Sequence, residues 1–193
     1  MIAAGVFLVL TYMVASIPTG PVLATLYADV DVTQQGSGNI GATNVYRVLG
    51  RRFGAATLVG DLLKGLIPVL LAVLVSERPW FPAAVGMIAF IAHCWPAYLE
   101  FRGGKGVATA AGVLYGLAPF VALLTTGVWM LAFLVLRKSS AAALLATLSL
   151  WLFVFWLRDD LLWVTALLTA GILQRHRANI DRLLRGEEPA VRS

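Results

Sequence analysis

Two glycine-rich polar segments lie between strongly apolar stretches of this chain. They read Gly36-Ser-Gly-Asn-Ile-Gly-Ala-Thr-Asn44 and Gly103-Gly-Lys-Gly-Val-Ala-Thr109. Glycine tolerates positive φ and lets the backbone approach a ligand closely, so several N–H groups can converge on an anion. Each segment also has a cation, Arg47 just after the first and Lys105 within the second. These residue types predict a site that handles phosphate at a membrane surface.

A second candidate group follows the last apolar stretch. His176 and Asn179 are three residues apart, so they share one face of a helix. Basic residues after a final span normally anchor the chain at the cytoplasmic surface, which explains Arg175 and Arg177 but neither His176 nor Asn179. Histidine is the commonest general base, and an asparagine amide can align a carbonyl or a phosphate. We predict that both are catalytic, with a phosphate oxygen of the substrate as the alternative base.

Several other polar residues have two interpretations. Asp61 and Lys64, three residues apart, can form an ion pair on one helix face. Ionisable residues in apolar helices are usually functional, although both could also extend to the nearest helix end, so they are either a structural pair or part of the site. His93 is likewise either structural or in contact with substrate. Asn39 and Asn44 can be ligands, or turn and cap residues.

Other motif matches are coincidental. The glycine spacing from Gly36 to Gly41 matches the dinucleotide fingerprint, but the required strand before it is absent. Lys105 lacks the Ser or Thr that follows the lysine of a P-loop. His176 to Asp181 spells His-x4-Asp, the motif of the common glycerolipid acyltransferases, which have a much larger catalytic domain. No Asp, Glu, His or Cys set has metal-ligand spacing, so neither a metal nor another cofactor is predicted.

The composition places the chain in a membrane. Hydrophobic residues make up 60% of it, charged residues 13%, and the mean hydropathy is +0.84; a soluble domain has about 25% charged residues. We predict an all-α integral membrane protein with one domain, residues 1–193. The apolar run that begins at Ile2 has no basic region before it, which favours a retained span over a signal peptide. The lone Cys94 excludes an intramolecular disulfide and is expected to be buried.

The number of crossings depends on one long apolar stretch. The apolar stretches cover residues 2–27, 54–75, 79–99, 107–136, 141–157 and 160–174. As a single helix, residues 107–136 would extend about 45 Å, well beyond the hydrocarbon thickness. Gly112, Gly116 and Pro119 interrupt this stretch. It can therefore also be a short crossing followed by a second one.

The distribution of Lys and Arg favours seven transmembrane helices, with the N-terminus outside and the C-terminus cytoplasmic. Cytoplasmic loops are enriched in these residues. In this topology twelve are inside and two, Arg78 and Arg158, are outside, while Lys64 lies within a span. The twelve are Arg47, Arg51, Arg52, Arg102, Lys105, Arg137, Lys138, Arg175, Arg177, Arg182, Arg185 and Arg192. With six crossings the split becomes six against eight, which is no bias.

This topology gathers the glycine segments and the basic tail on the cytoplasmic face. The outer connections are short and carry no comparable polar cluster, whereas a transporter is expected to hold polar residues near the midplane. The one-sided arrangement therefore favours an enzyme. A membrane transporter of a phosphorylated metabolite is the alternative. A non-catalytic lipid-binding or scaffold protein has no positive sequence feature in its favour.

Six motifs together carry a family resemblance. They are Ser16-Ile-Pro-Thr-Gly20, Gly36-Ser-Gly-Asn-Ile-Gly-Ala-Thr-Asn-Val-Tyr-Arg47, Asp61-Leu-Leu-Lys-Gly65, His93-x-x-Pro96, Phe101-Arg-Gly-Gly-Lys-Gly-Val-Ala-Thr109 and His176-Arg-x-Asn-Ile-x-Arg-Leu183. In this order they resemble the bacterial acyl-phosphate:glycerol-3-phosphate acyltransferases, the PlsY family, over nearly the whole chain. The chain departs from the family pattern at Pro21 and Lys138, outside the central motifs.

The resemblance implies seven helices in the bacterial inner membrane and an active site that faces the cytoplasm. It implies transfer of a fatty acyl group from acyl phosphate to the 1-position of sn-glycerol 3-phosphate. The product is lysophosphatidic acid, so this is the first step of bacterial phospholipid synthesis. No metal, other cofactor, nucleic acid or obligate protein partner is expected.

The two substrates can be assigned to the candidate residues. Arg47 and Lys105 would bind the phosphate of glycerol 3-phosphate, because Arg binds phosphate bidentately and Lys is a compact point charge. Ser37 and Ser140 would be hydroxyl donors. The backbone amides of the second glycine segment and Asn179 would hold acyl phosphate, and one of them would polarise its carbonyl. The remaining predicted substrate-binding residues are Gly38, Asn39, Gly41, Asn44, Lys64, His93, Gly103, Gly104 and Gly106.

Overall fold

The computed structural model describes residues 2–191 of the chain. Arg192, one of the predicted cytoplasmic charges, lies outside the described residues. Within 2–191 the chain forms helices and turns and no strand, which confirms the all-helical prediction. The helices form two compact units that divide between Leu117 and Ala118. The predicted single domain stays a prediction.

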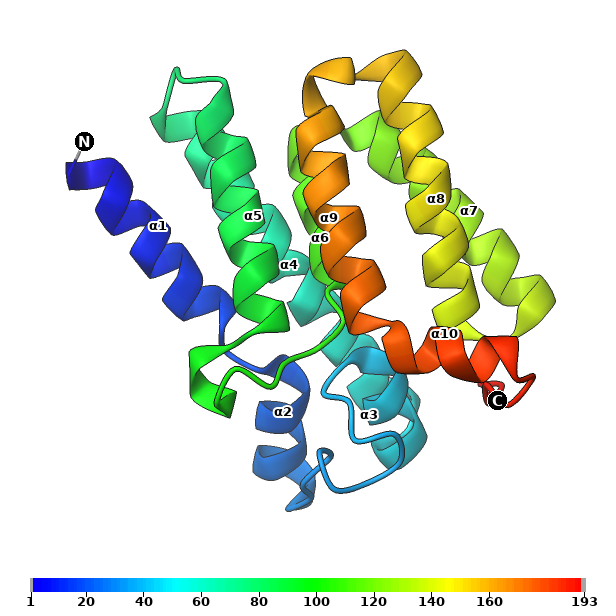
Figure 1. Cartoon of the computed structure of the whole chain (residues 1–193). Helices are drawn as coiled ribbons and strands as arrows, with labels where there is room; N and C mark the ends of the chain where they lie inside the picture. Colours follow the sequence, from blue (N-terminus) through cyan, green and yellow to red (C-terminus); the bar gives the residue numbers. More distant parts are fainter. Residues whose placement is uncertain (1, 192–193) are drawn as a thin grey trace. The chain divides into compact units, whose positions relative to one another are not determined.

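The first unit contains six α-helices and one 3-10 turn (Figure 1). They are α1 (Ile2–Ala15), α2 (Thr19–Ala28), α3 (Ala42–Leu49), α4 (Arg51–Val75), α5 (Trp80–Cys94), η1 (Ala97–Leu99) and α6 (Val107–Leu117). The long helix α4 is central, because it packs against all five other α-helices of the unit. Helix α5 packs on its other sides against α1 and α6. The two glycine segments are the connections before α3 and before α6.

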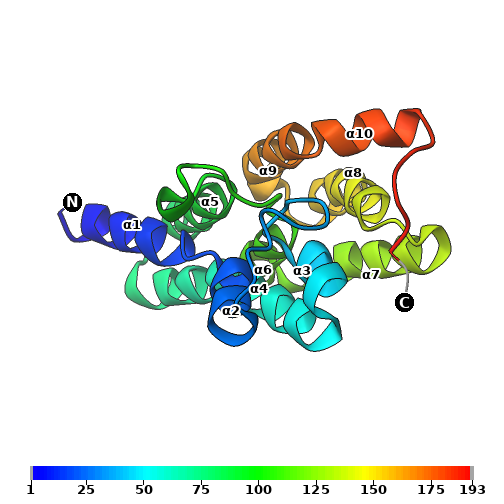
Figure 2. The ribbon, with the colours of Figure 1, turned by 90° about the horizontal axis from the view of Figure 1, so that it is seen from below.

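The second unit contains the remaining helices. They are α7 (Pro119–Leu136), α8 (Ser139–Leu157), η2 (Asp159–Leu161), α9 (Leu162–Arg175) and α10 (Arg177–Leu184). Helix α8 packs between α7 and α9, and α10 continues from α9. The chain after α10 turns back, and the Val191 N–H donates to the Arg137 carbonyl at 2.7 Å, next to the α7–α8 turn (Figure 2).

Prolines account for two helix breaks. Pro18 lies between α1 and α2, and the two helices differ in direction by 43°. Proline lacks an N–H and keeps the residue before it out of the helical region, so α1 ends before it. Pro119 is the first residue of α7, a position where the missing N–H costs nothing. The stretch 107–136 is therefore two helices, as the seven-helix prediction requires.

Within residues 2–191, four helical segments are long and apolar enough to cross a membrane. They are Arg51–Val75, Trp80–Leu99, Pro119–Leu136 and Ser139–Leu157, and the bent pair α1 and α2 makes a fifth if it counts as one span. Helices α6 and α9 have 11 and 14 residues, fewer than the roughly 20 that a straight crossing needs. The count of seven crossings and the orientation of the termini stay predictions.

Candidate active site

Asn44 anchors the first glycine segment. This residue of α3 is buried. Its Oδ1 accepts a hydrogen bond from the N–H of Ser37 at 2.8 Å, and its Nδ2 donates to the carbonyls of Val32 and Gln35, both at 3.0 Å. An asparagine amide has two N–H donors, and both are used here. Asn44, predicted to bind substrate, therefore holds the shape of the segment.

The glycines of this segment adopt conformations that other residues disfavour. Gly36 and Gly38 have φ values of 61° and 68°, in the region that glycine enters without steric cost. A Cβ atom on Gly36 would collide with Oδ1 of Asn44. The tight path around the asparagine thus requires glycine at position 36.

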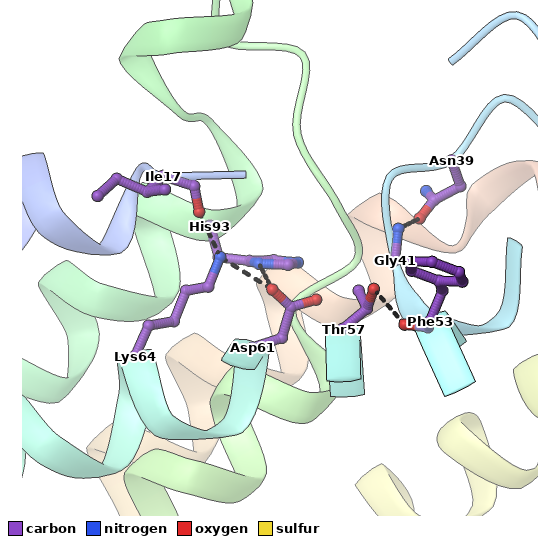
Figure 3. Close-up of polar contacts among 8 residues, drawn as sticks. All are labelled: Ile17, Asn39, Gly41, Phe53, Thr57, Asp61, Lys64 and His93. Atoms are coloured by element: carbon purple, nitrogen blue, oxygen red, sulfur yellow. Dashed lines mark hydrogen bonds and ion pairs between the residues drawn. The ribbon is translucent and has the colours of Figure 1, made fainter. Parts of the chain in front are cut away.

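The residues around this turn differ in accessibility. Asn39 Oδ1 accepts a hydrogen bond from the Gly41 N–H at 2.9 Å, directly before α3 (Figure 3). Asn39 thus stabilises the turn through its side-chain oxygen, as expected from its interpretation as a turn residue. Ser37 and Arg47, in contrast, are exposed. They can reach a ligand that arrives from solution.

The second glycine segment lies directly on the end of α5. The N–H of Gly104 donates to the carbonyl of His93 at 3.1 Å. A Cβ on Gly103 would collide with that same carbonyl, and a Cβ on Gly106 would collide with the ring of Phe90. Gly106 also has a φ of 79°. Only glycine allows this close approach, and it leaves Lys105 half-buried between buried neighbours.

This segment leads into the N-terminus of α6. The N–H of Ala110 donates to the carbonyl of Gly106 at 2.7 Å, so the helical hydrogen bonds begin at the last glycine. The first N–H groups of a helix have no partner within it, and the helix dipole favours an anion there. Together with the Lys105 ammonium, these groups can bind a phosphate.

A buried charged cluster lies beside this segment. The Lys64 ammonium is 2.9 Å from Oδ1 of Asp61 and donates to the carbonyl of Ile17 at 2.8 Å. Nδ1 of His93 lies 3.6 Å from the same Asp61 oxygen. The three side chains come from α4 and α5 and converge near the break between α1 and α2 (Figure 3). The predicted ion pair of Asp61 and Lys64 is present.

In the second unit, a glutamate that the sequence analysis missed holds two predicted site residues. Oε1 of Glu188 accepts hydrogen bonds from the Ser140 hydroxyl at 2.5 Å and from Nδ2 of Asn179 at 2.6 Å. Its Oε2 pairs with Nε of Arg182 at 2.7 Å. Glu188 itself is only 7% exposed. The tail thus ties α10 to the start of α8.

The surroundings of Glu188 change its acidity. Burial alone would raise the pKa of this carboxyl, since it disfavours the charged form. The hydrogen bonds from Ser140, Asn179 and Arg182, with the charge of the guanidinium, outweigh burial and lower the pKa below its ordinary value. Glu188 is therefore a carboxylate at neutral pH.

His176 is held in one orientation. It is 2% exposed and lies between α9 and α10. Its Nδ1 is 2.8 Å from the carbonyl oxygen of Ile172. A carbonyl can only accept, so Nδ1 carries the proton in the neutral ring and Nε2 carries the lone pair. This tautomer is the one that a general base working through Nε2 needs.

The structure distributes the predicted site residues over both units. Ser37, Gly38, Asn39, Gly41, Asn44, Arg47, Lys64, His93, Gly103, Gly104, Lys105 and Gly106 belong to the first unit, and Ser140, His176 and Asn179 to the second. Cys94 is buried, as predicted. Among residues 2–191, no three His, Cys, Asp or Glu side chains are grouped so as to hold a metal ion.

Comparison with known proteins identifies relatives over nearly the whole chain. The family model for glycerol-3-phosphate acyltransferase matches residues 5–186. The glycerol-3-phosphate acyltransferase of Hydrogenovibrio crunogenus is 42% identical over 184 residues, which cover 94% of this chain and 88% of the relative.

Two crystal structures of PlsY (YgiH), an integral membrane glycerol 3-phosphate acyltransferase, have a similar fold. The glycerol 3-phosphate form gives a TM-score of 0.92 and the lysophosphatidic acid form 0.90. Both are 41% identical to this chain and cover 97% of it and 95% of their own length. With its apolar helices, the chain is thus a multi-pass membrane protein. It belongs to the glycerol-3-phosphate acyltransferase family.

Proposed function

We propose that this protein transfers a fatty acyl group from acyl phosphate to the 1-hydroxyl of sn-glycerol 3-phosphate. The products are lysophosphatidic acid and inorganic phosphate. The observation that carries the proposal is the second glycine segment, in which Lys105 lies directly before the N-terminus of α6, and such a helix end favours an anion. Family membership supports glycerol 3-phosphate as the acyl acceptor, because the family model is that of glycerol-3-phosphate acyltransferase.

The accessible cations of the first unit suit the soluble substrate. Arg47 is exposed and Lys105 half-buried, so both can meet the phosphate of glycerol 3-phosphate, with the Ser37 hydroxyl as a further donor. Ser140 is assigned to the same phosphate. The amides of the second glycine segment and Asn179 are assigned to acyl phosphate. Charge-assisted hydrogen bonds of this kind are about twice as strong as neutral ones.

The reaction requires positioning and one proton transfer. Acyl phosphate is a mixed anhydride with a good leaving group, so an alcohol held at attack distance gains much of the rate. As the 1-hydroxyl oxygen bonds to the acyl carbon, Nε2 of His176 takes the hydroxyl proton. The carbonyl oxygen gains negative charge, which amide N–H groups stabilise. The carbonyl then re-forms and the carbon–oxygen bond to phosphate breaks.

The proposal includes a topology. Seven helices cross the bacterial inner membrane, with the N-terminus outside and the site facing the cytoplasm, where glycerol 3-phosphate is dissolved. The distribution of Lys and Arg supports this orientation. In this assignment the acyl chain stays in the lipid, and the protein works without a metal, another cofactor or an obligate protein partner.

One assay tests the function. Purified protein is mixed with palmitoyl phosphate and glycerol 3-phosphate, and lysophosphatidic acid and phosphate are measured. We expect both products in equal amounts, with no requirement for acyl-CoA or acyl carrier protein. Absence of transfer, together with uptake of the phosphate ester into proteoliposomes, would instead indicate the transporter.

A further inference from the structure

Asp61, Lys64 and His93 carry charge or polarity into the interior of the first unit, and no step of the proposed reaction uses them. Asp61 and His93 are 3% and 4% exposed, and the side chain of Lys64 is 8% exposed. Burying such groups is costly unless they are paired. Because burying these three side chains costs free energy, we expect the network that they form to have a function in the protein.

The Lys64 ammonium is used within the protein. It contacts the Asp61 carboxylate and the Ile17 carbonyl, two residues after the end of α1. A carbonyl near a helix C-terminus has no partner within the helix, and a lysine there satisfies it. Lys64 thus joins α4 to the break between α1 and α2. This geometry is typical of a structural cation and not of a ligand for phosphate.

The His93 ring lies between Asp61 and the second glycine segment. Its Nδ1 faces the Asp61 carboxylate at 3.6 Å. On the other edge, a Cβ atom on Gly104 would collide with Nε2 and would lie 2.8 Å from Cε1. The ring therefore occupies the space in which residue 104 would otherwise carry a side chain. The backbone of His93 also binds this segment, through the N–H of Gly104.

We infer that Asp61 and His93 are positioning residues for the phosphate-binding segment. Asp61 fixes the imidazole, the imidazole fixes the path of the backbone at Gly104, and this path sets where the neighbouring Lys105 and its amides meet phosphate. The inference rests on the proposed function for its kinetic consequence. Its structural part, the contact between residues 93 and 104, can be measured without substrate.

The contact between residues 93 and 104 is measured by adding a methyl group at one position and removing the ring at the other, which we call the size-exchange experiment. Gly104→Ala, His93→Ala and the double variant are purified, and their melting temperatures and their kcat and KM for glycerol 3-phosphate are compared. Gly104→Ala places a methyl group where the His93 ring lies and should lower kcat/KM about 100-fold. The double variant lacks the ring and has room for this methyl group, so its kcat/KM should recover at least about tenfold. Its melting temperature without substrate should rise above that of Gly104→Ala. Additive losses in both measurements would overturn the inference.

A conservative variant separates positioning from direct contact with substrate. His93→Gln keeps a side chain whose amide can face Asp61 and fill space near Gly104. Positioning predicts activity within about fivefold of wild type for His93→Gln and a loss of at least about tenfold for His93→Ala. Equal loss in both variants would mean that the imidazole itself is needed, and the inference would fall.

Asp61 is tested through its dependence on His93. Asp61→Asn should raise KM for glycerol 3-phosphate several-fold in the wild-type background and leave it unchanged in the His93→Ala background. Equal effects in both backgrounds would exclude Asp61 as the group that holds the ring. If Asp61→Asn does not fold, Asp61→Asn with Lys64→Met removes both charges and gives the same comparison.

Gly127→Ala is the matched control for the glycine change. It lies in α7, where an added Cβ has no atom within 4 Å. It should keep wild-type kinetics and melting temperature. If the wild-type protein transfers no acyl group, the proposed function fails, but the melting temperatures of the size-exchange set still decide whether residues 93 and 104 are coupled.

Discussion

At the scale of single residues, charge and hydrogen-bonding capacity distinguish ligands from supports. Arg47 is exposed, so its guanidinium can reach a dissolved ligand. Lys64 is also a cation, but its ammonium contacts Asp61 and Ile17. The residue type alone, read from the sequence, could not separate these roles, because the separation depends on partners from other helices.

Removing either accessible cation should weaken the use of glycerol 3-phosphate. A lost charge-assisted hydrogen bond is worth about 1.5–3 kcal/mol, which corresponds to a loss of roughly ten- to hundred-fold in kcat/KM. We expect this loss for Arg47→Ala and for Lys105→Ala in steady-state kinetics with palmitoyl phosphate. Arg52→Ala, an exposed arginine outside the proposed site, is the control. Unchanged kinetics of folded Arg47→Ala would remove Arg47 from the phosphate site.

His176→Ala should lose turnover more than substrate binding. The proton moves only in the transition state, so removal of the base lowers kcat and leaves KM nearly unchanged. General-base catalysis contributes about 10²–10⁴-fold, and a loss in this range is expected. Asp181→Ala, in the adjoining helix α10 and exposed, should behave like wild type. A kcat within a few-fold of wild type would transfer the role of base to a substrate phosphate.

Glu188 should make the stability of the tail depend on pH. Its pKa is lowered in the folded protein from an ordinary value of 4.5. A lowered folded-state pKa means that the carboxylate stabilises the fold above the unfolded-state pKa and that this contribution is lost as pH falls through the folded-state pKa. Glu188→Gln should thus cost about 1–3 kcal/mol at pH 7.

The measurement is the difference in melting temperature between wild type and Glu188→Gln at several pH values. The difference should be largest at neutral pH, begin to shrink as the pH falls below about 4.5, where the unfolded chain takes up the proton, and shrink further through the lower folded-state pKa. Glu187→Gln, at the exposed neighbouring position, should show no such difference. A pH-independent difference for Glu188→Gln would contradict the assignment.

At the scale of elements, the connections carry the chemistry and the helices hold them in place. The first glycine segment is irregular before α3, yet its path is fixed because Asn44 bonds the Ser37 N–H within it and the carbonyls of Val32 and Gln35 just before it. The second is fixed because its glycines lie against the end of α5. In each case a residue of an adjoining helix determines the shape of an irregular segment.

Asn44→Asp tests whether the first segment depends on its anchor. The substitution keeps the acceptor for the Ser37 N–H but loses both donors, and its charge would face the carbonyls of Val32 and Gln35. Leaving buried acceptors unsatisfied costs about 1–3 kcal/mol. We expect faster amide hydrogen exchange across residues 32–44 and a raised KM for glycerol 3-phosphate. Wild-type exchange rates would show that the segment is held by other contacts.

The sequence predicted the glycine segments and the helix break better than it predicted the side-chain contacts between distant parts of the chain. Both glycine segments and the break at Pro119 follow from local rules, namely the conformational freedom of glycine and the missing N–H of proline. The contact of Ser140 with Glu188 and that of His93 with Gly104 do not follow from such local rules. Ser140 and Glu188 are 48 residues apart, and no periodicity of apolar residues encodes which polar groups a folded tail will meet.

At the scale of the whole molecule, the central question is which side of the membrane each connection faces. Five apolar segments qualify as spans by length when α1 and α2 are counted together. The predicted seven requires α6 and α9 to cross as well, although they have 11 and 14 residues. The distribution of Lys and Arg favours seven crossings over six, because only an odd number puts the basic tail on the same side as Arg47, Arg51 and Arg52.

Cysteine labelling in intact spheroplasts decides the orientation. Single cysteines are introduced in a Cys94→Ala background whose activity has been checked. Glu77→Cys lies between α4 and α5 and Glu187→Cys lies in the tail, and both positions are outside the helices. Seven crossings place the first outside and the second in the cytoplasm, so a membrane-impermeant maleimide should label Glu77→Cys at once and Glu187→Cys only after lysis. Arg51→Cys, at the start of α4, should behave like Glu187→Cys. Labelling of Glu187→Cys before lysis, with Arg51→Cys protected, would require an odd number of crossings between the two positions. The basic tail, with His176 and Asn179, would then lie on the side opposite Arg47, and one site could not contain them all.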